Sequence, residues 1–230
     1  MDKEELDMDK RLYIAIIADI IGSRNIKERN TVQKHLENVL ERINETYQYA
    51  IASQFIITLG DEFQGVLHSG AVMMRILDRI QREMHPIAFR FGIGMGTLSV
   101  ALQADTSLGS DGSAFHLARA CIDAVQVLES KKAESKTNML IGIEGNEHTS
   151  SLLNTIFKLS WALQASWTLR QREIIGSLQQ FNETQAEIAK RLGIVQSSVQ
   201  KSLASSQYYT YKEATTMIGH TLQVLTNEQT

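Results

Sequence analysis

The sequence predicts an α+β protein in which an α/β sandwich precedes a helical C-terminal region. Three observations support this prediction. An apolar run at 12–18 ends in the acid Asp19, as expected of a buried strand that finishes at a functional edge. Two further apolar runs, at 54–59 and 62–67, flank a tight Gly-Asp turn and are typical of a β-hairpin. After residue 150, apolar residues recur only at helical spacing.

Composition limits the class of protein. The 230 residues allow one large domain or two modest ones, and a hydrophobic fraction of 43% is typical of a globular protein. A net charge of −3 gives no global field that would attract nucleic acid. No apolar run approaches the roughly 20 residues of a membrane span, and the acidic N-terminus is unlike a secretory signal. We therefore expect a cytoplasmic protein without a membrane partner.

The remaining elements of the sandwich follow from periodicity and from one helix breaker. Pro86, the only proline, disfavours helical geometry at the residue before it and so ends the second helix. We expect helices at 27–50, at 73–84 and from Ala114 to Leu128, and further extended segments at 87–100 and 138–143. The resulting order, β-α-β-β-α-β-α-β, makes a plausible single core for residues 1–145.

The boundary between the two expected domains lies in the polar segment 144–151, which is the best linker candidate. Residues 151–230 then form a helical domain, with a helix-turn-helix at about 168–206. The apolar helix at 151–167 is expected either to be core or to pair two subunits.

One extended segment carries glycine at every second position. In a strand, Gly92, Gly94 and Gly96 share one face, and the apolar side chains between them share the other. A strip without side chains lets another group approach the backbone closely. That group is either a tightly packed helix or the base or sugar of a nucleotide, and the sequence leaves both interpretations open.

Two acids mark a candidate phosphate and metal site. Asp19 is followed by Gly22-Ser23-Arg24, whose backbone N–H groups and guanidinium can bind phosphate oxygens. Mg²⁺ prefers carboxylate and phosphate oxygens, so Asp19 and Asp61 on neighbouring strands are suited to hold such ions. The structural alternative is that Asp61 serves the turn and Asp19 caps the next helix.

The segment 181–203 fits the helix-turn-helix pattern closely. Thr184 and Glu187 form a predicted capping box, and Gly193 permits the turn. The second helix of the pair would lie in a DNA major groove and present Gln196, Ser197, Ser198, Gln200 and Lys201. From Thr168 onward there are six Lys or Arg against five Asp or Glu, so weak DNA binding is expected without dimerisation. A helical trio that binds protein is the alternative.

Three segments together resemble a known class of enzymes. Residues 17–23, 59–63 and 91–96 look like the three sheet motifs of class III nucleotide cyclases and diguanylate cyclases. With the helix-turn-helix, the chain most resembles the SatD family. The resemblance implies a ferredoxin-like, nucleotide-cyclase-like sandwich, a homodimer and Mg²⁺ or Mn²⁺ bound by Asp19, Asp61 and the carbonyl of Ile20. The nucleotide contacts that it implies, or that the residues themselves suggest, are Gly22, Ser23, Arg24, Gly60, Gly92, Gly94, His116 and Arg119.

Departures from the cyclase pattern shape the functional hypothesis. Leu59 stands where diguanylate cyclases have glycine. Class III cyclases carry an asparagine and an arginine on the third helix. Here His116 occupies the place of that asparagine, and Arg119 is one residue out of register with that arginine. One residue rotates a helical side chain by about 100°. We therefore expect a cytoplasmic regulator that binds a nucleotide and controls a DNA reader, with no catalytic residue assigned. The alternative is an active nucleotide cyclase working as a homodimer.

Overall fold

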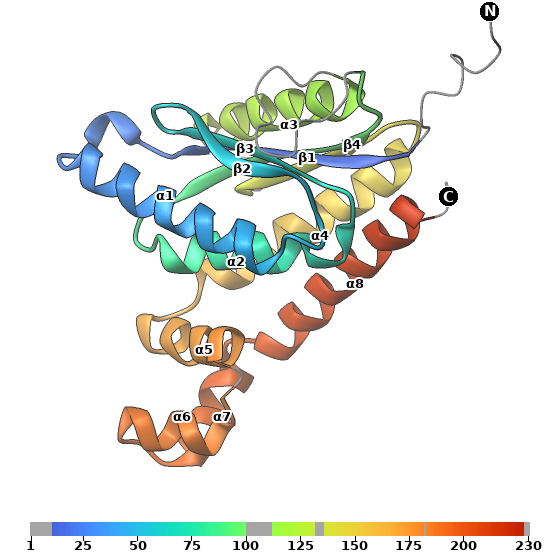
Figure 1. Cartoon of the computed structure of the whole chain (residues 1–230). Helices are drawn as coiled ribbons and strands as arrows, with labels where there is room; N and C mark the ends of the chain where they lie inside the picture. The colour runs from blue at the N-terminus through green and yellow to red at the C-terminus, as the bar shows by residue number, and fades with distance from the viewer. Residues whose placement is uncertain (1–10, 100–111, 132–135, 182, 228–230) are drawn as a thin grey trace, which may run out of the picture.

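A computed structural model describes residues 11–99, 112–131, 136–181 and 183–227, and it has a mixed α+β architecture (Figure 1). Its sheet has the order β2-β3-β1-β4-β5, in which only β4 and β5 run parallel. The predicted element order of the sandwich is confirmed. The strands are β1 (Tyr13–Ile20), β2 (Ile51–Leu59), β3 (Glu62–Leu67), β4 (Phe89–Gly96) and β5 (Met139–Ile143).

Helices cover both faces of the sheet, as Figure 1 shows. Of the helices in the described residues, α3 (Ser113–Ser130) covers one face, where it packs on Ala15, Ile17 and Val66. The other face carries the larger core, built around Ile14 and Ile16 of β1. The helices on that side are α1 (Arg29–Thr46), α2 (Met73–Glu83), α4 (Glu147–Ala165) and α8 (Tyr208–Asn227), with the short 3-10 turns η2 (Ser23–Asn25) and η3 (Gly70–Val72).

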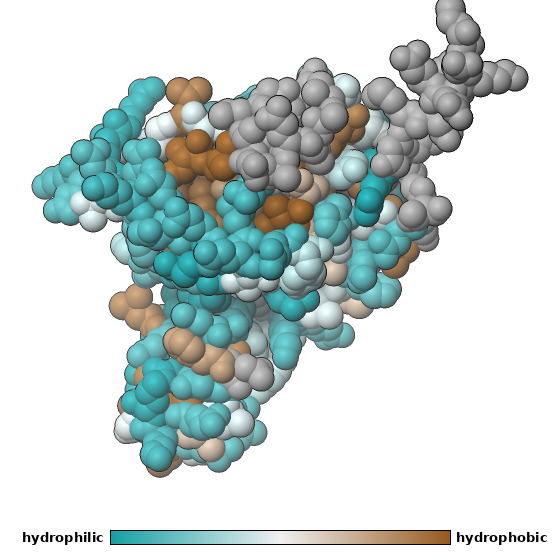
Figure 2. Space-filling model, viewed as in Figure 1, coloured by the Kyte–Doolittle hydropathy of each residue, from teal (hydrophilic) through white to brown (hydrophobic). Residues whose placement is uncertain are grey.

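Helix α1 illustrates how an amphipathic pattern places an element. Its residues Leu36, Val39, Leu40 and Ile43 are buried against the sheet, and its outer surface is hydrophilic (Figure 2). The helix is shorter than the predicted span of 27–50, because β2 starts at Ile51 and the chain must turn before it. None of the described helices combines the length and apolar character that crossing a membrane requires.

The glycine strip of β4 is the seat of α3. A Cβ atom on Gly92 would lie 2.1 Å from the carbonyl oxygen of Ala118, and one on Gly94 would lie 1.9 Å from that of Ala114. Both distances are far below van der Waals contact, so only glycine permits this approach. Helix α3 therefore fills the space that a base or sugar would need. The helix-packing interpretation holds for this face, and the prediction that Gly92 and Gly94 contact a nucleotide is wrong.

The segment 144–151 is the start of a helix, not a linker. Asn146 caps α4 by accepting a hydrogen bond from the N–H of Thr149 at 3.1 Å, and the N–H of Ile143 donates to the Ser150 hydroxyl at 2.9 Å. Leu153 and Phe157 of α4 belong to the larger core of the sheet. The division expected between 145 and 151 therefore does not separate the two cores of the molecule.

A second core forms further along the chain. Helices α5 (Leu169–Phe181), α6 (Gln185–Leu192) and α7 (Gln196–Ser205) make a lobe below the sheet in Figure 1. Trp167, Ile174 and Val199 are buried there together with Tyr211 of α8. Helix α8 also contributes Ile218 and Leu222 to the larger core, so α8 joins both cores.

Candidate functional site

The register of the sheet brings distant charges to the end of β1. Asp19 lies opposite Glu62 of β3 on one side and opposite Arg90 of β4 on the other. Asp61 occupies the β2–β3 turn, and its carbonyl oxygen accepts a hydrogen bond from the N–H of Ile20 at 3.2 Å. Asp19 and Asp61, 42 positions apart in the numbering of the chain, thus lie at the same end of the sheet.

Arg90 neutralises Asp19 directly. One guanidinium nitrogen, Nη1, donates to both carboxylate oxygens of Asp19, at 3.0 and 2.8 Å, and Nε donates to Glu129 of α3 at 2.7 Å. Burial raises the pKa of Asp19, Arg90 opposes that change, and the negative charges of Asp61 and Glu62 add to it. Sequence reasoning did not find Arg90, although its place on the same strand face as the glycine strip is a usable signal.

Arg119 forms a second pair nearby. Its guanidinium donates to the two carboxylate oxygens of Glu62, at 2.6 and 2.9 Å. The hydrogen bond that Arg119 donates to Glu62 raises the pKa of Arg119, and the charge of Asp19 adds to the effect. Helix α3 therefore places Arg119 at the acidic end of the sheet, where it is held by a carboxylate of this chain. His116, one turn earlier, is exposed and lines a different cleft, between α3, β5 and α4.

A small cleft gathers four of the predicted site residues. Ile20, Ser23, Gly60 and Asp61 line a space of about 230 Å³, together with α1 residues that include Arg29. Gly60 has a φ of +56° and Gly22, just outside the lining, a φ of +70°, a conformation that glycine adopts without strain. Arg24 is exposed and is not among the residues that line the cleft.

The donor atoms at this end of the sheet do not fit the implied pair of metal ions. Among the described residues there is no group of three or more His, Cys, Asp or Glu side chains arranged to hold a metal. Both oxygens of Asp19 are already bonded to Arg90, so a cation would have to displace a guanidinium. The Mg²⁺ or Mn²⁺ expected at Asp19, Ile20 and Asp61 stays a prediction that this arrangement does not favour.

Helices α6 and α7 form the second candidate site. The N–H of Glu187 donates to the Thr184 hydroxyl at 3.3 Å, and the N–H of Thr184 donates to the Glu187 carboxylate at 2.7 Å, so the predicted capping box is confirmed. Gly193, with a φ of +64°, ends α6. Val199 of α7 is buried, whereas the predicted contact residues Gln196, Ser197, Gln200 and Lys201 are exposed and Ser198 is half-buried.

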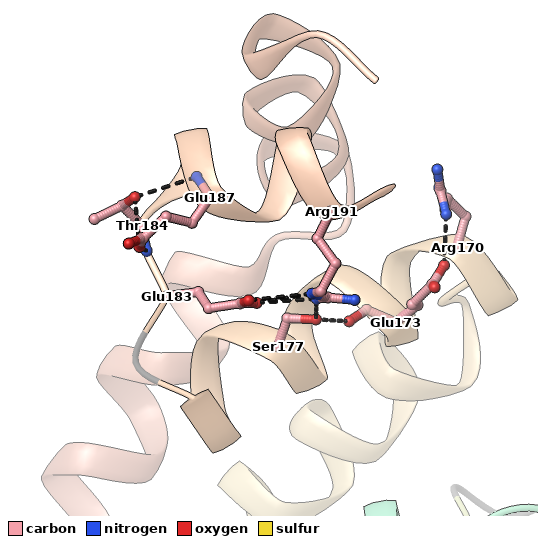
Figure 3. A network of polar contacts seen from close by, with 7 residues as sticks. All are labelled: Arg170, Glu173, Ser177, Glu183, Thr184, Glu187 and Arg191. Atoms are coloured by element: carbon pink, nitrogen blue, oxygen red, sulfur yellow. Dashed lines mark hydrogen bonds and ion pairs between the residues drawn. The ribbon is translucent and has the colours of Figure 1, made fainter. Parts of the chain in front are cut away.

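Carboxylates of the lobe neutralise part of its positive charge. Figure 3 shows Arg191 bonded to Glu183, at 2.9 Å, and to the hydroxyl of Ser177. Arg170 pairs with Glu173 at 2.6 Å in the same view. Lys190 and Lys201 make no such contact within the described part of the chain. These two lysines are the cations that α6 and α7 offer to a ligand.

The fold defines an α+β protein that combines a mixed five-stranded sheet with a helical lobe. The model of the SatD family matches residues 13–219. The chain belongs to the SatD family. It is also similar to a solved structure described as a bacterial light-regulated adenylyl cyclase, with 15% identity, a TM-score of 0.39, and coverage of 51% of this chain and 72% of that one. No curated protein matches the chain.

Proposed function

We propose that this protein is a DNA-binding regulator in which α6 and α7 form the DNA reader. The observation that supports this proposal most is the two-sided character of α7. Val199 and Leu203 are buried in the second core, whereas Lys201 on the opposite side and Gln200 on the flank of the helix are exposed. Glutamine can bond adenine edges in the major groove, and lysine binds guanine or phosphate. A short helix with an anchored back and a polar front is what major-groove recognition requires.

Charge sets the expected strength of this binding. Only Lys190 and Lys201 of α6 and α7 have no carboxylate partner among the described residues, so a single copy would make few phosphate contacts. DNA affinity depends heavily on such contacts, because each one releases a counterion. We therefore propose that two copies bind together as a homodimer, each with its own half-site. About four lysine–phosphate contacts would give a salt slope of about −4 in a double-logarithmic plot.

A direct test uses the full chain and a selected DNA target. Duplexes enriched from a random-sequence pool are titrated by fluorescence anisotropy between low and moderate salt. We expect Lys201→Ala to weaken binding across all sequences and Gln200→Ala to relax the preference at one base position. Lys34→Ala, an exposed lysine on α1, is the matched control and should leave binding unchanged. Enrichment of no duplex, or equal losses for Lys34→Ala and Lys201→Ala, would contradict the proposal.

The second part of the proposal concerns the cleft of Ile20, Ser23, Gly60 and Asp61, which we assign to the phosphates of a nucleotide. The Ser23 hydroxyl and the Arg29 guanidinium line it, and both groups bind phosphate oxygens. At about 230 Å³ the space is below the size of a typical drug-sized site, so the base would lie outside. Because Arg90 already neutralises Asp19, we propose that this binding does not depend on a metal.

Isothermal titration of ATP, GTP and cyclic nucleotides tests the cleft. We expect heat with at least one of them, equal affinity in Mg²⁺ and in EDTA, and a loss with Arg29→Ala. Asp61→Asn should bind as tightly as the unchanged protein or more tightly, because it removes a negative charge beside the phosphates. Binding that requires Mg²⁺ and is lost with Asp61→Asn would instead restore the metal-dependent hypothesis. No heat with any nucleotide would end this part of the proposal.

A further inference from the structure

A second cleft, between α2, α5 and α8, carries an excess of positive charge. Its volume is about 460 Å³, within the range of sites that hold small molecules. Four cations line it, against one carboxylate: Arg75, Arg79, Arg82, Lys212 and the acid Asp78. On α2 the charged residues recur at positions 75, 78, 79 and 82, a spacing that places them on one face of a helix. This cleft is distinct from both sites assigned above.

The acid forms no direct ion pair with the cations in the described part of the chain. Asp78 accepts a hydrogen bond from the Tyr211 hydroxyl, and the Gln179 amide lies 3.5 Å from its other oxygen. No ion pair joins Asp78 to Arg82 among the described residues. Of the four cations, only Arg79 has a carboxylate partner in that set, Glu83, at 2.7 Å. Asp78 is thus occupied with holding α8 to α2 and leaves the positive charge of the cleft in place.

Arg82 is a cation of this cleft whose hydrogen bonding is incomplete. Its Nη1 donates to Gln179 at 3.3 Å, but its Nε is buried and has no hydrogen-bond partner among the described residues. Burial lowers the pKa of Arg82. A buried donor without a partner is costly, and native proteins rarely leave one unpaired unless a water, an ion or a ligand satisfies it. Arg75 and Lys212 are exposed and likewise have no side-chain partner within the described residues.

We propose that this cleft is a binding site for a small anion that carries a diphosphate group, held by Arg75, Arg82 and Lys212. Guanidinium forks match the geometry of phosphate oxygens, and lysine supplies a mobile point charge. Thr215 and Thr216 of α8 also line the cleft, and their hydroxyls donate to the carbonyl oxygen of Lys212 at 3.0 and 2.7 Å. Several converging cations suit a compact, multiply charged anion better than a single carboxylate. The occupant would contact α2 and α8 together, and α8 follows directly after the proposed DNA reader.

The experiment is isothermal titration of the full-length protein with inorganic pyrophosphate at constant ionic strength. We expect saturable binding that falls about tenfold or more in the double variant Arg75→Ala with Lys212→Ala, because two charge-assisted contacts are lost. Both side chains are exposed, so the variant should fold normally, which its unfolding midpoint verifies. Lys34→Ala, an exposed lysine on α1 that lines neither cleft, is the matched control and should bind pyrophosphate unchanged, whereas Arg29→Ala reports any pyrophosphate bound in the smaller cleft near β1.

Further arms identify the anion. Citrate, a small anion with three carboxylates, should bind more weakly than pyrophosphate, and ADP should compete with pyrophosphate if the diphosphate is recognised as part of a nucleotide. The proposal is overturned if pyrophosphate does not bind, if citrate binds as tightly, or if Arg29→Ala removes the binding and the double variant keeps it. That last outcome would place the phosphate in the cleft near β1, so a failure here is distinct from a failure of the nucleotide site proposed there.

Discussion

Two charged regions of this protein differ in whether their arginines have carboxylate partners. At the end of β1, Arg90 bonds Asp19 and Glu129, and Arg119 bonds Glu62. In the cleft between α2, α5 and α8, Arg82 has a buried Nε without a partner. The first region is a closed network, in which each cation already has its anion. The second region is an open cluster, in which three of the four cations have no carboxylate partner among the described residues.

This difference determines where an anionic ligand would bind more favourably. A ligand at the closed network must displace an existing ion pair before it forms a new one. A ligand at the open cleft would pair with Arg75 and Lys212, which are exposed and have no carboxylate partner among the described residues. Asp19 and Glu62 at the end of β1 are already paired with arginines, so the cleft of α2 and α8 is the better candidate for an anion site.

The largest effect is expected from disturbing the seat of α3, which carries Arg119 and Glu129 to the closed network. Gly94→Ala would place a Cβ atom 1.9 Å from the backbone oxygen of Ala114. Backbone cannot yield as a side chain does, so we expect a loss of at least about 3 kcal/mol in the free energy of unfolding, measured by urea denaturation.

Gly142, the partner of Gly94 on the adjacent strand β5, provides the matched control. A Cβ atom there would meet the side chain of Leu117, with its nearest atom at 3.1 Å. A flexible leucine can shift, so Gly142→Ala should cost less than about 1 kcal/mol. Equal losses for the two variants would show that α3 is not held at backbone contact.

A smaller effect is expected when the closed network loses its central cation. Arg90 is only 12% exposed and bonds two carboxylates, so Arg90→Leu leaves Asp19 partly buried without its partner. We expect a loss of about 2 kcal/mol in the free energy of unfolding at neutral pH. Arg119→Ala removes a cation that is 47% exposed and should cost less than about 1 kcal/mol. A larger loss for Arg119→Ala would mean that the network depends on its outer pair.

Local signals in the sequence were sufficient to predict much of this fold. The Gly60-Asp61 turn between two apolar runs gave the hairpin, because that turn chemistry depends only on neighbouring residues. The capping box of Thr184 and Glu187 was equally readable, since its two partners are three positions apart. In the same way, alternation in β4 predicted which face would carry the glycines.

What the sequence could not show depends on distant partners or on signals with two meanings. Asp19 and Arg90 are 71 positions apart, and only the register of β1 with β4 brings them together. Asn146 begins a helix here, but asparagine is equally common in turns, so the start of α4 was interpreted as a linker. The charged residues of α2 at 75, 78, 79 and 82 form a polar face that the sequence shows, but a polar face on an amphipathic helix usually only faces solvent and does not by itself indicate a binding site.

Asp78, the acid of the open cleft, makes the stability of the protein depend on pH. Burial raises the pKa of Asp78 to about 6, against an ordinary value of 3.8, whereas the Tyr211 hydroxyl and the charge of Arg82 act in the opposite direction. The folded protein therefore binds a proton at Asp78 that the unfolded chain releases between about pH 4 and pH 6. Stability contributed by this protonation is complete below pH 4 and is lost as the pH rises through 6.

Asp78→Asn isolates that contribution, because asparagine can still accept the hydrogen bond from Tyr211 and does not titrate. Between pH 4 and pH 7, the free energy of unfolding of the unchanged protein should fall by about 2 kcal/mol relative to that of the variant. Above pH 7 the difference between the two proteins should stay constant. Denaturation curves at a series of pH values give this difference directly. If instead the unchanged protein gained stability relative to the variant as the pH rises, Asp78 would be stabilised as a carboxylate by the cations around it. The cleft between α2, α5 and α8 would then be a closed network like the one at the end of β1.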